Sequence, residues 1–242
     1  MTWFILPGWG LPPKDYEKLA GLLGPDTRTL DSWKVPLTAD TDDIRAELGA
    51  LDSPKVDLLG HSLGGLAAIE WALRRPDQVR QLVLIDPTAP DEVPSRFHVE
   101  GKLRRGMDKL AGAAVEALWR VGPQIRRWGI RQTTGSEDAL PIDEARARYG
   151  TRENSRRLAE QLSASWAHAA RVDALLDAGA ARRRSPAPLL LVGAGNGKQR
   201  RFLRSQWDLG RKLHARTIML TGQNHVFPLT RPDLVVRHIE NL

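Results

Sequence analysis

Apolar and polar positions alternate in two distinct patterns along the first ninety residues. Short apolar runs of strand length lie at residues 3–6, 27–30, 56–59 and 81–85, and segments with helical spacing lie between them at 15–23, 41–51 and 63–73. Strands that alternate with helices predict βαβ units and a parallel sheet. The runs 56–59 and 82–85 are almost continuously apolar, as central strands covered by helices on both faces should be.

The pattern changes to helical periodicity between residues 88 and 185, where Gly, Pro and Arg clusters interrupt it and no convincing strand is found. Strand-like runs return at 188–193 and 217–220, with a helix through residue 214 and a last helix from about residue 231. We therefore predict a mostly parallel sheet of about six strands, flanked by helices. The chain divides into an α/β core of residues 1–87 and 186–242 and a helical insertion of residues 88–185.

The composition limits both the expected cellular location and the kinds of site that the chain can form. Hydrophobic residues make up 41% of the chain and charged residues 27%, and no apolar run reaches the roughly 20 residues that a membrane span requires. The apolar start at residues 1–7 is interpreted as a strand and not as a signal peptide. The 242 residues include no cysteine, so disulfides, a thiol nucleophile and thiolate metal ligands are excluded, and a cytoplasmic location is the expectation.

The formal net charge of +7 indicates an attraction to anions. Arginine pairs at 104–105, 126–127 and 156–157 form either a cationic rim for an anionic substrate or acidic carrier protein, or only a solvated face. The basic residues do not alternate with aromatic ones as in nucleic-acid modules, so no nucleic-acid partner is expected.

The candidate chemistry begins at Gly60-His61-Ser62-Leu63-Gly64, where an apolar strand turns directly into a helix. A serine hydroxyl is a poor nucleophile, and a sharp turn between small residues lifts it clear of the sheet. The helix that starts after Ser62 also leaves backbone N–H groups unpaired, including that of Leu63, which can hold a developing oxyanion. A purely structural glycine-rich turn can have the same sequence pattern, but the strand before it and the helix after it favour a catalytic nucleophile.

This stretch resembles the nucleophile elbow of the α/β-hydrolase fold, and the resemblance covers most of the chain outside residues 88–185. It implies an α/β-hydrolase fold, a cap formed by the insertion, and a histidine base after the last strand, where His225 stands. Histidine titrates near neutrality and so can take and return the serine proton. The stretch Leu6 to Gly10 is similar to the family's His-Gly-aromatic-Gly loop, which implies the Trp9 N–H as a second oxyanion donor, with core packing of the Trp9 ring as the alternative.

The sequence offers two candidates for the third member of a catalytic triad. In the family the acid usually follows the strand that here ends near residue 192, but residues 193–198 hold no carboxylate and Asn196 stands near that place. An amide can orient an imidazole but cannot stabilise its cation. Some relatives carry the acid after the preceding strand, where Asp86 follows residues 82–85. Asp86, Asn196 or no residue completes the site.

The resemblance implies a serine hydrolase that cleaves a carboxylic ester or acyl thioester through an acyl-enzyme on Ser62, as in small carboxylesterases and acyl-thioester hydrolases. It implies no cofactor and no metal. The expected substrate is a small acyl ester or thioester, and both an anionic substrate and one attached to an acidic carrier protein fit this expectation. Two alternatives use the same residues: an acyltransferase, or a hydrolase-fold binding or accessory protein with little turnover.

Overall fold

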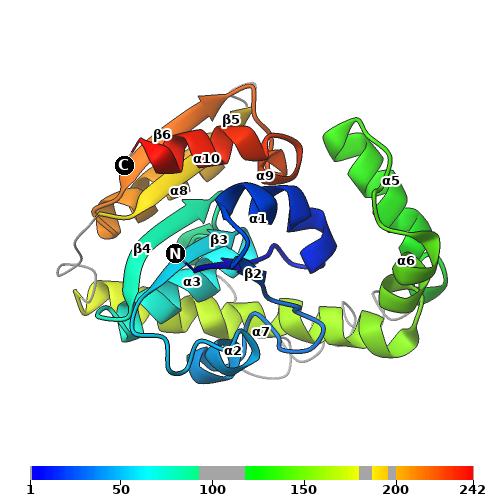
Figure 1. The fold of residues 1–242 in the computed structure, drawn as a ribbon, viewed down its shortest axis with the longest axis horizontal. Coiled ribbons are helices and arrows are strands. Elements are labelled where there is room, and N and C mark those ends of the chain that lie inside the picture. Colours follow the sequence, from blue (N-terminus) through cyan, green and yellow to red (C-terminus); the bar gives the residue numbers. More distant parts are fainter. Residues whose placement is uncertain (1, 93–117, 180–186, 196–199, 242) are drawn as a thin grey trace.

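The computed structural model describes residues 2–92, 118–179, 187–195 and 200–241. In this part of the chain six strands form a single sheet, and Figure 1 shows how the helices lie around it. Every strand pair is parallel, and the strand order is β2-β1-β3-β4-β5-β6. The predicted sheet of six strands is thus confirmed, and it is parallel throughout. The strands are β1 (Trp3–Leu6), β2 (Arg28–Thr29), β3 (Val56–His61), β4 (Val79–Ile85), β5 (Leu189–Gly195) and β6 (Arg216–Thr221).

Successive side chains of each strand enter opposite faces of the sheet, because strands have a period of two. In β3, for example, Leu58 joins one buried cluster and Leu59 the other. The first cluster lies under α2 (Thr41–Glu47), α3 (Leu63–Arg74), α7 (Arg152–Asp177) and α8 (Arg200–Lys212). The second lies under α1 (Glu17–Leu23), α9 (Phe227–Thr230) and α10 (Pro232–Glu240). Helices therefore cover both faces, which explains the continuous apolar runs of the strands.

The chain between β4 and β5 contains α5 (Gly122–Thr134), α6 (Ile142–Tyr149) and α7, which we call the connecting helices; short 3₁₀ turns lie at Pro13–Tyr16, Pro90–Glu92 and Leu118–Arg120. The second half of α7 packs into the main core through Ala169 and Val172, whereas Leu158 near its start packs with Tyr149 of α6. Residues 93–117 and 180–186 of the predicted insertion lie outside the described residues, so the division into core and insertion stays a prediction. Among the described helices, including α7 with its 26 residues, none has the length and apolarity needed to cross a bilayer.

Candidate active site

Ser62 occupies an unusual backbone conformation at the junction of β3 and α3. Its φ is 54° and its ψ is −123°, a region that residues with a side chain rarely adopt. Three backbone hydrogen bonds hold it: the Ser62 N–H donates to the Ile85 carbonyl at 3.1 Å, and the Gly65 and Thr88 N–H groups each donate to the Ser62 carbonyl at 2.9 Å. Backbone strain of this kind concentrates at functional sites, where the surrounding structure enforces it.

Gly64 allows the start of α3 to press against the end of β1. A Cβ at position 64 would lie 2.1 Å from the Leu6 carbonyl oxygen, so no side chain fits there. This contact sets the first turn of α3 beside the segment Pro7 to Leu11, which we call the β1 loop. Within the described part of the chain, the backbone N–H groups of Trp9 and Leu63 have no acceptor. Trp9 is 36% exposed, so its ring is not a core side chain.

His225 and the first acid candidate, Asp86, come from the ends of β6 and β4, the two strands that flank β5 in the sheet. His225, in the loop after β6, has its Nε2 3.0 Å from Ser62 Oγ. Its Nδ1 lies 3.4 Å from Oδ2 of Asp86, which directly follows β4. The other carboxylate oxygen of Asp86 accepts the Gly193 N–H at 2.7 Å. Burial raises the pKa of Asp86, whereas His225 and the Gly193 amide act in the opposite direction.

Asp86 is fully enclosed and its backbone is also unusual. The residue is 1% exposed and has a φ of 40°; Ser62 and Asp86 are two of the three non-glycine residues with positive φ in the described ranges. A Cβ at Gly193 would lie 2.9 Å from Asp86 Oδ2 and from the Asn224 carbonyl oxygen, so glycine at the end of β5 leaves room for both. Asn196, the other candidate for this position, lies outside the described residues.

A second histidine ties the backbone of His225 to the β1 loop. His61 is fully buried, with Nδ1 2.6 Å from the Tyr16 hydroxyl and Nε2 2.8 Å from the His225 carbonyl oxygen. Because a carbonyl only accepts, Nε2 carries the ring proton and Nδ1 accepts from Tyr16. The Tyr16 oxygen in turn accepts the Gly8 N–H at 2.8 Å. No role is predicted from the sequence for Tyr16 or His61, because nothing local marks this contact.

We expect the unfolding free energy of the His61→Gln variant to fall less than that of the wild type when the pH is lowered below 7. Burial, with a further contribution from His225, lowers the pKa of His61 from 6.5 to about 3. Between these values the unfolded chain binds the proton and the folded chain does not, so acid favours unfolding. From pH 7 to pH 5 the wild type should lose about 2 kcal/mol of unfolding free energy that the variant keeps. Urea titrations at both pH values measure the unfolding free energies. Equal losses in the wild type and the variant would contradict the prediction. The control is His214→Gln, at an exposed histidine.

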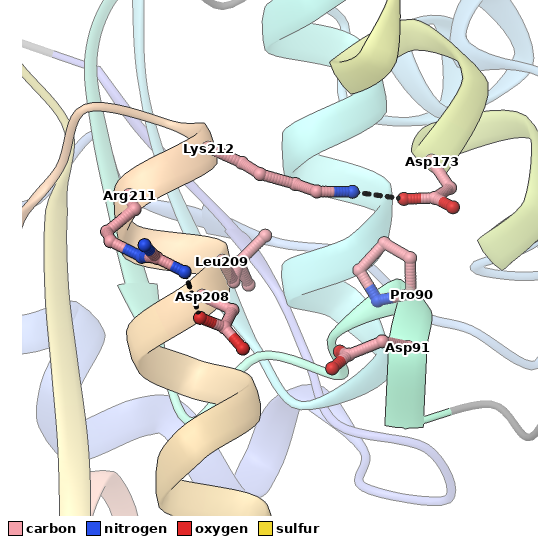
Figure 2. A pocket seen from close by; sticks show the side chains of 7 residues that line it. All are labelled: Pro90, Asp91, Asp173, Asp208, Leu209, Arg211 and Lys212. Carbon is pink, nitrogen blue, oxygen red and sulfur yellow. Dashed lines mark hydrogen bonds and ion pairs between the residues drawn. The ribbon is translucent and has the colours of Figure 1, made fainter.

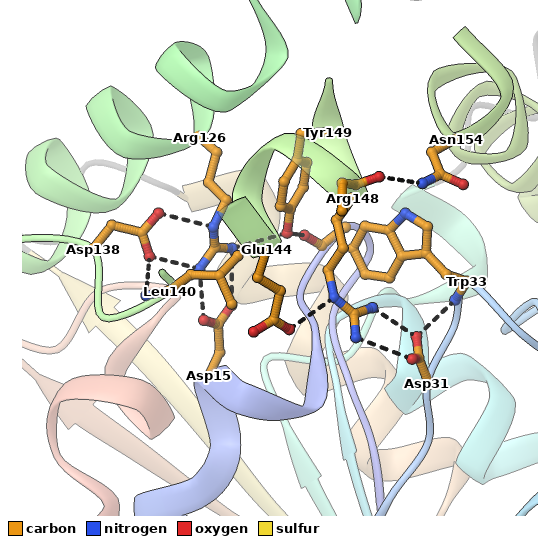
Figure 3. Close-up of polar contacts among 12 residues, drawn as sticks. Asp15, Asp31, Trp33, Arg126, Asp138, Leu140, Glu144, Arg148, Tyr149 and Asn154 are labelled. Atoms are coloured by element: carbon orange, nitrogen blue, oxygen red, sulfur yellow. Dashed lines mark hydrogen bonds and ion pairs between the residues drawn. The ribbon is translucent and has the colours of Figure 1, made fainter. Parts of the chain in front are cut away.

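The connecting helices contact the β1 loop at Gly10 and the 3₁₀ turn that follows it at Asp15 (Figure 3). Arg126 of α5 pairs with Asp15 and Asp138, and Tyr149 of α6 donates to the Gly10 carbonyl oxygen at 2.7 Å. Arg126 is 8% exposed, so both predicted alternatives, a cationic rim and a solvated face, are wrong for this residue: it pairs with buried carboxylates instead of facing solvent. Residues 104–105 of that rim lie outside the described ranges, whereas Arg127, Arg156 and Arg157 are exposed.

A separate cavity of about 470 Å³ lies between α7, α8 and the turn at Pro90–Glu92 (Figure 2). None of Ser62, His225 and Asp86 lines it. Its charged side chains pair with one another, Lys212 with Asp173 at 2.7 Å and Arg211 with Asp208 at 2.5 Å. We assign it no role. Over the described ranges, no three metal-ligating side chains gather in one place.

Comparison with known proteins agrees with this fold. A stretch of 123 residues is 32% identical to pimeloyl-[acyl-carrier protein] methyl ester esterase of Neisseria meningitidis, covering 46% of this chain and 45% of that protein. A stretch of 58 residues is 43% identical to lipase LipV of Mycobacterium tuberculosis, covering 23% of this chain and 22% of the lipase. The chain therefore spans less than half the length of the curated relatives it matches.

Solved structures and family models extend the likeness to the whole chain. A thermophilic esterase from Thermogutta terrifontis superposes with a TM-score of 0.64 at 17% identity, over 100% of this chain and 88% of the esterase, a likeness of fold alone. The model of the alpha/beta hydrolase family matches residues 4–238. The chain belongs to the alpha/beta hydrolase family.

Proposed function

We propose that the chain is a serine hydrolase that cleaves a carboxylic ester or an acyl thioester through an acyl-enzyme on Ser62. The observation that carries the proposal is the 3.0 Å approach of His225 Nε2 to Ser62 Oγ on a strained turn. The other ring nitrogen of His225, Nδ1, lies 3.4 Å from the enclosed carboxylate of Asp86. The esterase and lipase names of the relatives support the same reaction class.

In the first half of the reaction, His225 takes the proton of Ser62 as the oxygen attacks the acyl carbon. The Nε2 atom is within hydrogen-bonding distance of the hydroxyl, as a general base must be. The proton then passes to the leaving alcohol or thiol as its bond to the acyl carbon breaks. Asp86 holds Nδ1 protonated and stabilises the imidazolium that forms between these two transfers.

The tetrahedral oxyanion is held by the N–H groups of Trp9 and Leu63. Both amides lack an acceptor in the described structure, and the contact of Gly64 with Leu6 brings their two segments together. Main-chain donors cost no reorganisation when the charge develops, and the loss of one such donor slows a comparable reaction about 100-fold or more. The Leu63 amide also belongs to the first turn of α3, whose dipole favours an anion.

In the second half, a water molecule attacks the acyl carbon and gives a proton to His225. The bond between the acyl carbon and Ser62 Oγ then breaks, His225 returns the proton to Ser62, and the acid product leaves. The protein groups supply this chemistry without a cofactor. We propose a small acyl ester or thioester as the substrate, including one attached to an acidic carrier protein. The net charge of +7 and the carrier-linked substrate in the name of the Neisseria relative support the last class.

Fluorophosphonate labelling with intact-mass analysis tests the proposal. The wild type should gain one adduct, and peptide mapping should find it on Ser62; Ser62→Ala should gain none, because the reacting oxygen is gone. Ser136→Ala, at an exposed serine, is the matched control and should label as the wild type does. A folded wild-type protein that takes up no label would overturn the proposal.

Product analysis then separates hydrolysis from acyl transfer. With a p-nitrophenyl ester as the only acyl donor, a hydrolase releases nitrophenol and free acid in equal amounts without an added acceptor. A transferase, after one fast turnover, would need an added alcohol or amine to continue, because water would then deacylate Ser62 slowly.

A further inference from the structure

The connecting helices hold both central residues of a turn in the β1 loop. The Leu11 N–H closes this turn on the Gly8 carbonyl oxygen at 3.1 Å, and Gly10 has the positive φ of 69° that a glycine accepts at the third position of a turn. The Trp9 indole N–H donates to the Leu158 carbonyl oxygen of α7 at 2.9 Å, and the Gly10 carbonyl accepts from Tyr149 of α6.

The geometry of this turn determines where the Trp9 N–H points. The Gly8 carbonyl and the Trp9 N–H belong to one planar trans peptide unit, so they point in opposite directions. Because the carbonyl faces into the turn toward Leu11, the N–H faces out of it. Any rotation of this peptide unit would move the proposed oxyanion donor, and the contacts of Trp9 and Gly10 oppose that rotation.

Arg126 fixes the orientation of the Tyr149 hydroxyl. Its Nη1 donates to the Tyr149 oxygen at 2.9 Å, and a guanidinium has no acceptor, so the tyrosine proton is directed to Gly10. Burial also raises the pKa of Tyr149, which keeps that proton in place. Arg126 in turn is held by Asp15 and Asp138, with 2% to 6% of each of the three side chains exposed (Figure 3).

We propose that Tyr149 and Arg126 are positioning residues for the oxyanion hole: the connecting helices hold the β1 loop in the conformation in which the Trp9 N–H receives the oxyanion. This inference rests on the proposed function. It gives the helices a part in catalysis that does not depend on contact with the substrate. Burial of the charged Arg126, Asp15 and Asp138 side chains also has an unfavourable free energy, since charges lose hydration on burial.

The same helix α6 provides a matched control. Arg148 also joins α6 to the chain after β2, through two hydrogen bonds of 3.0 and 3.2 Å to Asp31, a residue that lies outside the β1 loop (Figure 3). Arg148→Gln therefore loosens the attachment of α6, whereas Tyr149→Phe removes the contact with Gly10 and keeps the ring that packs on Trp33.

The experiment measures the rate constant of fluorophosphonate labelling, kcat and KM for a p-nitrophenyl ester, and the unfolding free energy of both variants and of the wild type. We expect Tyr149→Phe to label about tenfold more slowly and to lose kcat by the same factor, with KM nearly unchanged, because misplacing one donor weakens only the transition state. Arg148→Gln should label within about twofold of the wild type, because its hydrogen bonds to Asp31 do not involve the β1 loop.

Each outcome has a distinct meaning. A Tyr149→Phe variant that is folded and labels at the wild-type rate overturns the positioning role and leaves the proposed function intact. Labelling rates that fall in both variants in proportion to their loss of stability overturn it as well. A wild-type protein that does not label overturns the proposed function and this inference together.

Discussion

Asp86→Asn is expected to lower kcat about ten-thousand-fold, the size of the loss when the acid of a serine triad becomes an amide. The Gly193 N–H donates to one side-chain oxygen of residue 86 and accepts nothing, so the asparagine carbonyl must stay on Gly193. The asparagine NH₂ group then faces His225 Nδ1, which has to act as the acceptor. The ring proton moves to Nε2, which faces Ser62 and can no longer take its proton.

Steady-state kinetics on a p-nitrophenyl ester, with a circular dichroism spectrum to establish folding, measures this effect. Asp91→Asn is the matched control: it changes a carboxylate five residues further along, which binds Ser205 and not a histidine. We expect the control to keep kcat within about twofold of the wild type. A loss of only a few fold for Asp86→Asn would remove Asp86 from the triad and leave Asn196, or no residue, in that role.

Arg126→Met is expected to cost about 3–5 kcal/mol of unfolding free energy at neutral pH. It leaves Asp15 and Asp138 enclosed side by side without their cation, and removing one partner of a buried pair has a penalty of this size. Burial raises the pKa of Asp15 even in the wild type, and loss of Arg126 removes the main opposing influence. The folded variant then binds protons more tightly than the unfolded chain, so its deficit should shrink as the pH falls from 7.5 to 5.

Urea denaturation at the two pH values checks both parts of this prediction. Arg127→Met, at the exposed neighbouring position on α5, should stay within about 0.5 kcal/mol of the wild type. A deficit below 1 kcal/mol for Arg126→Met, or one that grows in acid, would contradict the view that Arg126 neutralises these two carboxylates.

Features with a local signature could be predicted from the sequence. The apolar run at 217–220 is the centre of β6 (Arg216–Thr221), and its position in the strand order led to His225, which the structure sets beside Ser62. The turn at Ser62 could also be predicted, because a strand, a turn of small residues and a helix follow one another directly in the sequence. The catalytic roles of these residues remain predictions.

Polar contacts between distant segments left no such signature. Arg126 and Asp15 are 111 positions apart, and an arginine beside another arginine reads as a surface residue until its partners are known. The contact of Tyr16 with His61 is missed for the same reason, since periodicity reports the burial of apolar side chains and not the pairing of polar ones. The choice between Asp86 and Asn196 depends on which of the two strand ends lies near the imidazole. Positions along the chain do not give this distance in space.

The pairing of β4 with β5 also bears on how the chain folds during synthesis. Val83 of β4 pairs with Leu189 of β5, so the whole β4–β5 segment must leave the ribosome before the sheet extends past its fourth strand. Contacts between such distant positions form late and slowly. Until then the nascent protein presents β4 as an open edge, which is prone to pairing with other chains, and Ser62 lacks its hydrogen-bond partner because His225 is not yet synthesised.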